Sequence, residues 1–445
     1  MLVLPSPSQG AAAEIPCSAS AKHTTLETSA RLDPSCVYTG GFDVTASRVT
    51  LDCRGALIDG SGRDGVGILV HAPVDADLSS ITIRNCVVRG FLNSIRITRD
   101  GFRQLAAGRE YEHGIQDVAI ERTRVSGSRG VGIFVDGYVS HVAIRRSSVT
   151  GAGSSGIYLE AGSTDNLVAH NDIRDNGSRE NGPQGELFTV GGARFRYWGT
   201  GREGISVDGS RRNRIVGNRL SGNAAGGIYL YTNCGEYVNS RPERWFERRY
   251  GATGNRIARN HLDGAVNGVW VGSRMAESTF PMDCSDPPYV KQGLTWITLD
   301  RAAGNAVVAN RFTDVVYGVR VEDDDTRVAR NRFEAGDATH HAVVIGTPYR
   351  TSALSRPVRG TELLANRAMI LGNGDPYRWV EGQTGTRVAR NRALGRPASL
   401  CEGRSLPRGP FVMTLALAYE PPGAPETPPP DLTVPTVGAL PACGE

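Results

Sequence analysis

A five-residue phrase recurs through the chain and limits the folds open to it. In each copy a glycine precedes an apolar residue, a variable residue, a second apolar residue and a second variable residue. Copies begin at Gly132, Gly156, Gly204, Gly227, Gly268 and Gly318. Side chains alternate between the two faces of a strand, so the apolar positions share one face and the variable positions share the other. The phrase predicts short strands with one uniform buried face and one variable face, where we expect function.

A second phrase ends in asparagine and alternates with the first. Its copies end at Asn171, Asn218, Asn260, Asn310, Asn331, Asn366 and Asn391. Asparagine tolerates a left-handed turn, and its amide can stack on the asparagine of the next copy, so we interpret these residues as a structural ladder. The spacing is 21 residues from Asn310 to Asn331 and 25 from Asn366 to Asn391. This is the period of a parallel β-helix.

The two phrases together predict an all-β solenoid of about eleven coils over residues 49–395. With a rise of about 4.8 Å per coil, the rod should be roughly 50 Å long. Residues 1–13 look like the remnant of a secretory signal, and residues 14–48 are expected to cap the open end of the solenoid. Residues 396–445 form a proline-rich C-terminal extension.

Four long insertions interrupt the coils, at about 99–113, 174–202, 232–254 and 273–303. Each joins the chain next to a strand of the first phrase. Three of them are rich in aromatic residues, a composition that disfavours disorder, and loops of this length are often functional. We therefore expect the insertions to form walls beside one sheet face.

Eight cysteines and no Cys-x-x-Cys pair indicate a few disulfides in a secreted or periplasmic protein. A Cys234–Cys284 bridge would tie two insertions together, and Cys401 and Cys443 could fix the tail. The pairing among Cys17, Cys36, Cys53 and Cys86 cannot be deduced from sequence.

The net charge of +4 implies no strong attraction to nucleic acid, and no segment predicts membrane insertion. The chain has only two lysines, Lys22 and Lys291, so nearly all of its positive charge is arginine. Codon usage and an acidic substrate are both open as explanations. The oligomeric state is not predicted.

The alternating phrases resemble the right-handed parallel β-helix superfamily of polysaccharide-active proteins, which includes pectate lyase-like and polygalacturonase-like members. The resemblance covers residues 49–395. It implies a right-handed coil and a glycan bound along one sheet face. The catalytic motif set of polygalacturonases and the Asp-Pro-His motif of mannuronan epimerases are not found, so the resemblance does not select a reaction.

Three carboxylates occupy the fifth position of three consecutive strands: Asp136, Glu160 and Asp208. Neighbours should lie about 5 Å apart. Like charges at this spacing require either a raised pKa or a cation between them. Carboxyl groups about 5 to 5.5 Å apart suit retaining glycoside hydrolysis, and about 6.5 to 9.5 Å suits inversion. We predict these three residues to be catalytic; ordinary solvated surface charge is the alternative.

The variable face also supplies candidate substrate contacts. Aromatic rings on successive strands would stack on sugar rings, although burial under the insertions explains them equally well. The predicted substrate-binding residues are Tyr158, Glu203, Tyr229, Tyr231, Trp270, Arg320 and Glu322.

We therefore predict an exported polysaccharide-cleaving enzyme that uses two-carboxylate hydrolysis and needs no metal or cofactor. One alternative is a Ca²⁺-dependent lyase or C5-epimerase acting on a uronic acid-containing glycan. Its candidate bases are Arg202, Tyr231, Arg320, His340 and His341. A non-catalytic glycan-binding or envelope-assembly protein is the second alternative.

Overall fold

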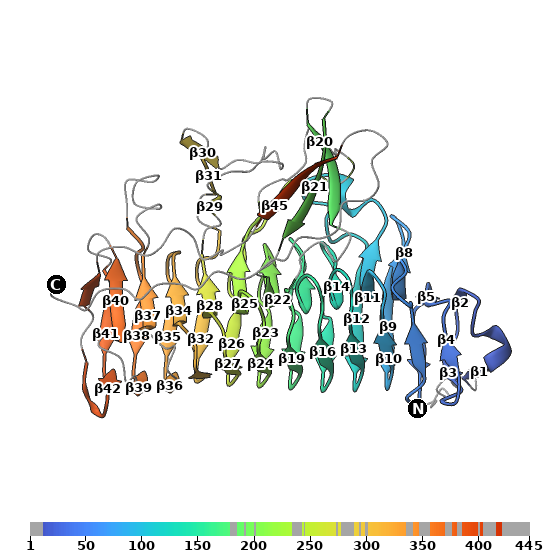
Figure 1. Ribbon diagram of the computed structural model, residues 1–445, viewed down its shortest axis with the longest axis horizontal. Helices are drawn as coiled ribbons and strands as arrows, with labels where there is room; N and C mark the ends of the chain where they lie inside the picture. The colour runs from blue at the N-terminus through green and yellow to red at the C-terminus, as the bar shows by residue number, and fades with distance from the viewer. Residues whose placement is uncertain are drawn as a thin grey trace, which may run out of the picture.

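The computed structural model describes residues 12–178, 185–190, 193–199, 202–233, 243, 245–272, 275–276, 289–292, 295–298, 301–334, 341–346, 357–369, 376–380, 385–398, 401–403 and 415–420. These residues build a long solenoid of three sheets, each with thirteen strands (Figure 1). Neighbouring strands are parallel except at the β42–β43 end. The predicted all-β parallel β-helix is confirmed.

Sheet A consists of β1 (Ala13–Ile15), β3 (Ala30–Leu32), β6 (Thr50–Asp52), β9 (Leu78–Arg84), β12 (Ile115–Glu121), β15 (Ala143–Arg145), β18 (Leu167–Ala169), β23 (Arg214–Val216), β26 (Arg256–Ala258), β32 (Ala306–Val308), β35 (Arg327–Ala329), β38 (Glu362–Leu364) and β41 (Arg387–Ala389).

Sheet C follows sheet A within each coil. It consists of β4 (Val37–Tyr38), β7 (Leu57–Asp59), β10 (Val87–Arg89), β13 (Arg124–Ser126), β16 (Ser148–Thr150), β19 (Asp172–Arg174), β24 (Arg219–Ser221), β27 (His261–Asp263), β33 (Arg311–Thr313), β36 (Arg332–Glu334), β39 (Arg367–Met369), β42 (Arg392–Ala393) and β43 (Arg396–Pro397).

Sheet B contains the strands of the first phrase. It consists of β2 (Thr24–Leu26), β5 (Phe42–Val44), β8 (Val66–Ala72), β11 (Asn93–Arg99), β14 (Ile133–Val135), β17 (Ile157–Leu159), β22 (Glu203–Asp208), β25 (Gly226–Tyr231), β28 (Asn267–Val271), β34 (Tyr317–Val321), β37 (His341–Ile345), β40 (Tyr377–Val380) and β44 (Cys401–Gly403).

The core is a stack of apolar side chains inside the coil. In sheet B the second position of the phrase is in register from coil to coil, as the Ile133↔Ile157 and Ile157↔Ile205 pairs show. These isoleucines are fully buried. Period-two alternation thus places the second and fourth positions inside, as the sequence predicts, and leaves the third and fifth outside the coil.

The asparagines form the expected ladder at the corner between sheets A and C. Asn218 Oδ1 accepts hydrogen bonds from the backbone N–H of Asn171 at 2.9 Å and from its Nδ2 at 3.0 Å. Asn218 Nδ2 in turn donates to Asn260 Oδ1 at 2.9 Å and to the carbonyl of Val168 at 2.9 Å. The amide therefore satisfies polar backbone groups that the coil buries.

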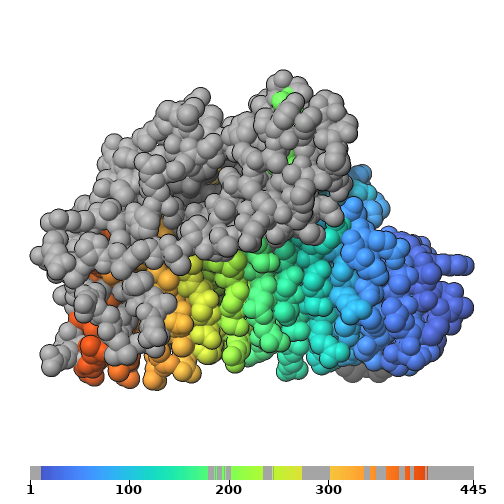
Figure 2. Space-filling view, viewed as in Figure 1, coloured from blue at the N-terminus to red at the C-terminus, as the bar shows by residue number. Residues whose placement is uncertain are grey.

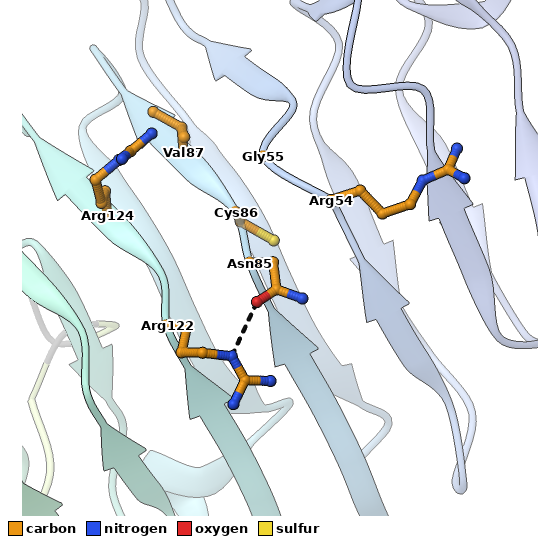
Figure 3. Close-up of a pocket in the computed structure, with 7 residues that line it drawn as sticks. All are labelled: Arg54, Gly55, Asn85, Cys86, Val87, Arg122 and Arg124. Carbon is orange, nitrogen blue, oxygen red and sulfur yellow. Dashed lines mark hydrogen bonds between the residues drawn. The ribbon is translucent and has the colours of Figure 1, made fainter.

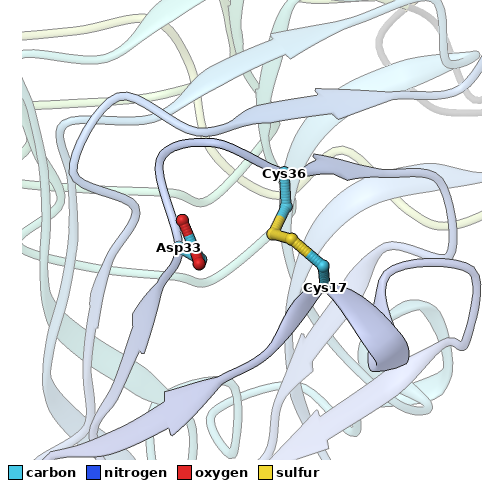
Figure 4. Close-up of side chains that lie close together, drawn as sticks. All are labelled: Cys17, Asp33 and Cys36. Atoms are coloured by element: carbon cyan, nitrogen blue, oxygen red, sulfur yellow. A yellow bond between two sulfur atoms is a disulfide. The ribbon is translucent and has the colours of Figure 1, made fainter.

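The coils begin earlier than the first recognisable phrase. Strands β1 to β5 lie within residues 13–44, before the predicted start of the coils at residue 49, and β43 and β44 follow their predicted end at residue 395. Between residues 49 and 395, sheets A and C each have eleven strands, as predicted. The first turns, from β1 to β5, contain neither repeated phrase, and parallel pairing alone incorporates them. The disulfide between Cys17 and Cys36 (Figure 4) holds the first turns, and Cys53–Cys86 bridges the next two coils. The expected bridges of Cys234, Cys284, Cys401 and Cys443 lie outside the described side chains.

Two insertions form small antiparallel sheets of their own. In residues 174–202, β20 (Glu186–Val190) and β21 (Ala193–Gly199) pair, and β45 (Leu415–Glu420) adds to β21. In residues 273–303, β29 (Met275–Ala276), β31 (Thr295–Thr298) and β30 (Tyr289–Gln292) form the other sheet. Both sheets rise above the coil on one side (Figure 1). Figure 2 shows the stacked coils from the same direction, coloured in chain order from blue at the N-terminal end to orange and red.

Helical structure among the described residues is limited to two short 3₁₀ turns, η1 (Cys17–Ala19) and η2 (Phe102–Gln104). Within this part of the chain, no helix is long and apolar enough to cross a membrane.

Candidate functional site

Sheet B brings the three predicted catalytic carboxylates onto successive coils. Phe134 pairs with Tyr158, and Tyr158 pairs with Ser206, so Asp136, Glu160 and Asp208 follow one another at equivalent positions. Adjacent members are therefore one strand spacing apart, about 4.8 Å between backbones. We refer to Asp136, Glu160 and Asp208 as the acid column.

The acid column is buried rather than open to solvent. Asp136 and Asp208 have no exposed surface, and Glu160 is 6% exposed. Arg96 pairs with Asp136 at 2.8 Å, and Arg248 pairs with Glu160 at 2.8 Å. Arg248 also lies 3.8 Å from Asp208. The cation that closely spaced carboxylates require is thus a guanidinium, contributed to Glu160 and Asp208 by the third insertion.

Asp208 is the most densely bonded member of the column. Its Oδ2 accepts hydrogen bonds from the Tyr158 hydroxyl at 2.7 Å and from Asn233 Nδ2 at 2.8 Å, and its Oδ1 accepts from the Asn233 backbone N–H at 2.7 Å. Despite these donors, burial raises the pKa of Asp208 above the usual aspartate value. Burial likewise raises the pKa of Asp136, against the opposing effect of Arg96. Burial therefore makes both carboxyls harder to ionise than an exposed aspartate.

Two insertions cover this part of sheet B. Phe102 and Tyr138 pack against Phe246 in a buried cluster, and the rings of Phe102 and Phe246 meet edge to face at 5.4 Å. Arg249 pairs with Glu110 at 2.7 Å and so joins the insertion at 99–113 to the one at 232–254. The insertions do gather on the variable face, as expected, but over the acid column they form a roof rather than separate walls.

Glu203 is the first residue of β22, and Tyr231 is the last residue of β25, the neighbouring strand of sheet B. Its Oε1 accepts hydrogen bonds from Ser206 and, at 3.0 Å, from the Tyr231 hydroxyl. Glu203 is fully buried, and its Oε2 has no hydrogen-bond partner in the part of the chain that the structure describes. The structure thus places a second buried carboxylate centre beside the acid column.

The predicted aromatic contacts form a closed cluster. Trp270 meets Tyr229 edge to face at 5.3 Å and stacks with Tyr231 at 5.9 Å. All three rings are fully buried. Asn267 donates to the Tyr229 hydroxyl at 2.8 Å, which in turn donates to the Ala225 carbonyl at 2.7 Å. These rings pack against one another, the burial alternative that the sequence left open.

The remaining predicted residues lie further along the same face. Arg320 and Glu322 pair with each other at 2.6 Å and are both buried. Among the alternative bases, Arg202 is buried near the Tyr158 ring, with its guanidinium 6.0 Å from the ring centre. His341 stacks on Tyr317 with ring centres 6.1 Å apart. His340 lies outside the described residues.

Sequence reasoning missed two residues that contact the acid column, Arg248 and Asn233. Both belong to the insertion at 232–254, which has no repeat and therefore no readable register. Arg96 lies on β11 beside Phe134, at a variable position of sheet B, and its ion pair with Asp136 was not predicted from the sequence.

Two further features lie away from sheet B. A pocket of about 420 Å³ at the corner between sheets A and C is lined by Arg54, Gly55, Asn85, Cys86, Val87, Arg122 and Arg124 (Figure 3). Cys17, Asp33 and Cys36 come close enough to suggest metal ligands (Figure 4). Their two sulfurs are joined in a disulfide, so no thiolates are available there to bind a metal.

Comparison with known proteins gives a match to the family model described as "Right handed beta helix region" over residues 55–242. No curated protein sequence matches the chain. An alginate lyase from Paenibacillus sp. str. FPU-7 is similar in structure, with a TM-score of 0.41, 14% identity, and coverage of 82% of this chain and 92% of that one.

Two other solved structures are similar to a comparable degree. The A-module of mannuronan C-5 epimerase AlgE6 from Azotobacter vinelandii has a TM-score of 0.44 and 14% identity, covering 86% of this chain and 91% of that one. The catalytic domain of a GH87 α-1,3-glucanase in complex with nigerose has a TM-score of 0.44 and 10% identity, covering 88% and 63%. The family model matches part of the chain, and the three stacked parallel sheets agree with it on the fold: this chain folds as a right-handed parallel β-helix.

Proposed function

We propose that this protein is an exported enzyme that hydrolyses glycosidic bonds in a polysaccharide, using the acid column on sheet B. The observation that supports this proposal most strongly is the pairing of Glu160 and Asp208 on adjacent coils around one guanidinium, that of Arg248. Glycoside hydrolysis needs two carboxyl groups at close range, one of which carries a proton. The polysaccharide substrate itself is inferred from the resemblance of the repeat to polysaccharide-active β-helix proteins.

The environments of the two carboxyls suggest their roles. Asp208 has a pKa raised by burial and is the proposed general acid, which protonates the leaving oxygen. Glu160 holds a hydrogen bond from Arg248 at 2.8 Å and is the proposed nucleophile. A separation near one strand spacing matches the geometry of retaining enzymes, so the anomeric configuration should be kept. Asp136, on the other side of Glu160, is the third carboxyl of the proposed site and is paired with Arg96.

Substrate access requires a rearrangement of the roof. Because Asp208 is fully buried and Arg248 spans both carboxyls, a sugar can reach the pair only if the Arg248 side chain is displaced. Tyr158 and Glu203 would then line the opened site, and the ring cluster of Tyr229, Tyr231 and Trp270 would be its adjoining wall. The pair Arg320 and Glu322 is the proposed contact at the far end of the same face.

Chemistry by β-elimination is the second candidate, and Tyr158 is the residue that bears on it. Burial raises the pKa of the Tyr158 hydroxyl well above its usual value, and the neighbouring Asp208 raises it further. A tyrosine that resists ionisation is a poor general base at neutral pH. This argues against Tyr158 as the base of a lyase or epimerase and leaves the predicted bases Arg202, Tyr231, Arg320 and His341 open. A Ca²⁺-dependent route would additionally need the metal to take the place of Arg248 between Glu160 and Asp208.

Export to an oxidising compartment is part of the proposal. The disulfides Cys17–Cys36 and Cys53–Cys86 in the first coils support it, because such bonds persist mainly outside the cytosol.

The test is incubation with a panel of neutral and uronic acid-containing polysaccharides. We expect new reducing ends without the ultraviolet absorbance of an unsaturated product. Ultraviolet absorbance that is lost when Ca²⁺ is chelated would instead indicate Ca²⁺-dependent elimination. Retention of a glycan in a binding assay, with no turnover of any member of the panel, would replace catalysis by a binding role.

A further inference from the structure

A column of basic residues runs along the edge where sheet A turns into sheet C, far from the acid column in the fold. The first residue of six successive sheet C strands is basic: Arg219, His261, Arg311, Arg332, Arg367 and Arg392. Strand pairing puts each directly beside the next, from Arg219↔His261 to Arg367↔Arg392. We call these six residues the basic column. Figure 1 shows its strands along the lower edge of the solenoid, opposite the antiparallel sheets.

The basic column is exposed and does not extend over the whole rod. All five of its arginines are exposed, and His261 is half-buried. Side-chain exposure reaches 55% at Arg311 and 66% at Arg332. In the preceding five coils the same position holds Leu57, Val87, Arg124, Ser148 and Asp172, of which only one is basic. A uniform preference for arginine in the sequence does not explain a run confined to one half of the molecule.

The charge around the column is strongly segregated. The six segments 214–221, 256–263, 306–313, 327–334, 362–369 and 387–393 hold twelve arginines against three carboxylates, an excess of nine positive charges. The whole chain has a net charge of only +4, so the rest of it is net negative by five. Like charges side by side on a sheet are unfavourable, and such an edge attracts polyanions.

The carboxylates present neutralise only part of the edge. Glu334 pairs with both Arg311 and Arg332. Glu362 lies 3.7 Å from Arg327 and 3.3 Å from Arg387. Within the described chain, Arg367 and Arg392 have no carboxylate partner; nor do Arg214, Arg219, Arg256, Arg259, Arg330 and Arg390.

We infer that this edge binds a linear anionic polysaccharide that lies along the rod axis. The column presents one basic residue per coil, about 4.8 Å apart, and five of the six are arginines, whereas burial lowers the pKa of His261. A linear polymer with a carboxylate on each sugar can follow such a row and contact several guanidiniums in succession. Arginine suits this role because its planar group binds carboxylates through two hydrogen bonds.

Two other polyanions fit the edge less well. Single-stranded nucleic acid is usually held by aromatic stacking, and in these six segments the aromatic residues Phe312 and Phe333 point into the core. A membrane surface is broad, so it would also face Asp263 and Glu334, the acidic last residues of β27 and β36. The exposed apolar side chains of these segments, Met369 and Val388, occur only in the last two coils.

The pocket in Figure 3 lies at the same corner, nearer the N-terminal end, and contains Val87 and Arg124 from the equivalent position. Ser148 and Asp172 separate it from the basic column. The inference therefore concerns the basic column alone. It does not depend on the acid column or on the proposed reaction, and its test measures binding rather than turnover.

The test is the affinity of the full chain for sodium polygalacturonate, measured by calorimetry at low and at moderate salt, with dextran as the neutral polymer. The variant R367Q/R392Q removes two column charges that lack carboxylate partners. The control R31Q/R48Q removes the same charge from exposed arginines at the N-terminal end. Unchanged thermal unfolding would show that both variants fold.

We expect R367Q/R392Q to bind polygalacturonate at least about fivefold more weakly at low salt and with a shallower salt dependence, as loss of ionic contacts implies. The control should stay within about twofold, and dextran should not bind at the edge. Equal losses in both variants would reduce the effect to net charge and overturn the inference. The inference would also be overturned if the column arginines were needed for binding to phosphatidylglycerol vesicles or to single-stranded DNA but not for binding to polygalacturonate.

Discussion

Asp208 illustrates how a position on a sheet becomes chemically unusual once it is covered. The residue has no exposed surface, although three hydrogen-bond donors and Arg248 surround it. Its pKa is raised because the cost of burying the charge exceeds the gain from these partners. The folded state therefore binds a proton at Asp208 more tightly than the unfolded state does.

This difference makes a prediction about stability and pH. The stabilising effect of the raised pKa is complete below the unfolded aspartate pKa, about 3.9, and is lost as pH rises through the higher folded value. The free energy of unfolding of the wild type, relative to D208N, should therefore fall as pH increases from 4. Chemical denaturation of both proteins between pH 3 and pH 8 measures it. A flat difference would mean that Asp208 is ionised in the folded protein as readily as in solution.

Asp165 provides the control of opposite sign. It pairs with Arg212 at 2.7 Å near the surface, and the hydrogen bond from Arg212 lowers the pKa of its carboxyl. Its stabilising effect is present above the unfolded pKa and is lost as pH falls through the folded value. The stability of the wild type relative to D165N should thus increase with pH below about 4 and stay level above it, where the stability relative to D208N decreases.

At the scale of elements, the asparagine ladder holds sheet A to sheet C around every corner from Asn171 to Asn391. Each amide accepts from the backbone of one neighbouring coil and donates to the other, as at Asn310 and Asn331. Earlier coils use shorter side chains at this position, where the Ser147 hydroxyl accepts from the Thr123 N–H at 3.2 Å. Serine and asparagine therefore occupy the same corner position in different coils, and asparagine can make more hydrogen bonds there than serine.

We expect N218A to lower the free energy of unfolding by about 3 kcal/mol, because the buried N–H of Asn171 and the Val168 carbonyl lose their partners. N218S is the matched control. Its hydroxyl can still accept from Asn171, as Ser147 accepts from Thr123, so the loss should be about half as large. Urea denaturation measures both. Equal losses would show that shape rather than hydrogen bonding decides the residue at the corner.

The elements most faithfully predicted are those with an obligatory period. Ile157 and Ile205 had to face inward, and Tyr158 and Ser206 outward, because alternation leaves no other register for the repeated phrase. Strands β1 to β5 could not be predicted from the repeated phrases, since parallel pairing needs no particular residues at the variable positions. The contacts of the insertions could not be predicted for a different reason. Arg248 lies in an insertion that contains no repeat, so no periodicity in the sequence indicates that it pairs with Glu160.

At the scale of the molecule, the solenoid is a stack in which each coil contacts mainly its neighbours. Its stability is therefore close to a sum over adjacent coils, and the ends are the places where unfolding starts. The N-terminal end has two disulfides, which close loops of 19 and 33 residues of sequence separation. Chain entropy alone assigns each about 3 to 4 kcal/mol.

We expect the double variant C53A/C86A to lower the free energy of unfolding by about 3 kcal/mol, with the destabilisation confined to the first coils. Hydrogen exchange should become faster in the first coils, from β1 to β10, and stay slow in the coils from β23 to β36. Uniform acceleration over all coils would contradict the picture of independent ends and indicate a single cooperative unit.

The candidate site was predictable in part. The stacking of Asp136, Glu160 and Asp208 followed from the repeat, but their burial and their arginine partners depend on how the insertions fold over sheet B. The same limit applies to Trp270, which an open face would present to a sugar and the actual cluster encloses. Sequence periodicity determines where a side chain points, whereas tertiary packing of the insertions determines what covers it.

The most direct test of the proposed chemistry is the turnover of E160Q and D208N on a polysaccharide that the wild type cleaves, with D165N as the folded surface control. Removing a general acid or a nucleophile should lower the rate at least about a hundredfold in each catalytic variant. D165N should match the wild type, and unfolding curves should show that all variants fold. Rates within about threefold of the wild type for both E160Q and D208N would contradict the assignment of the site to the acid column.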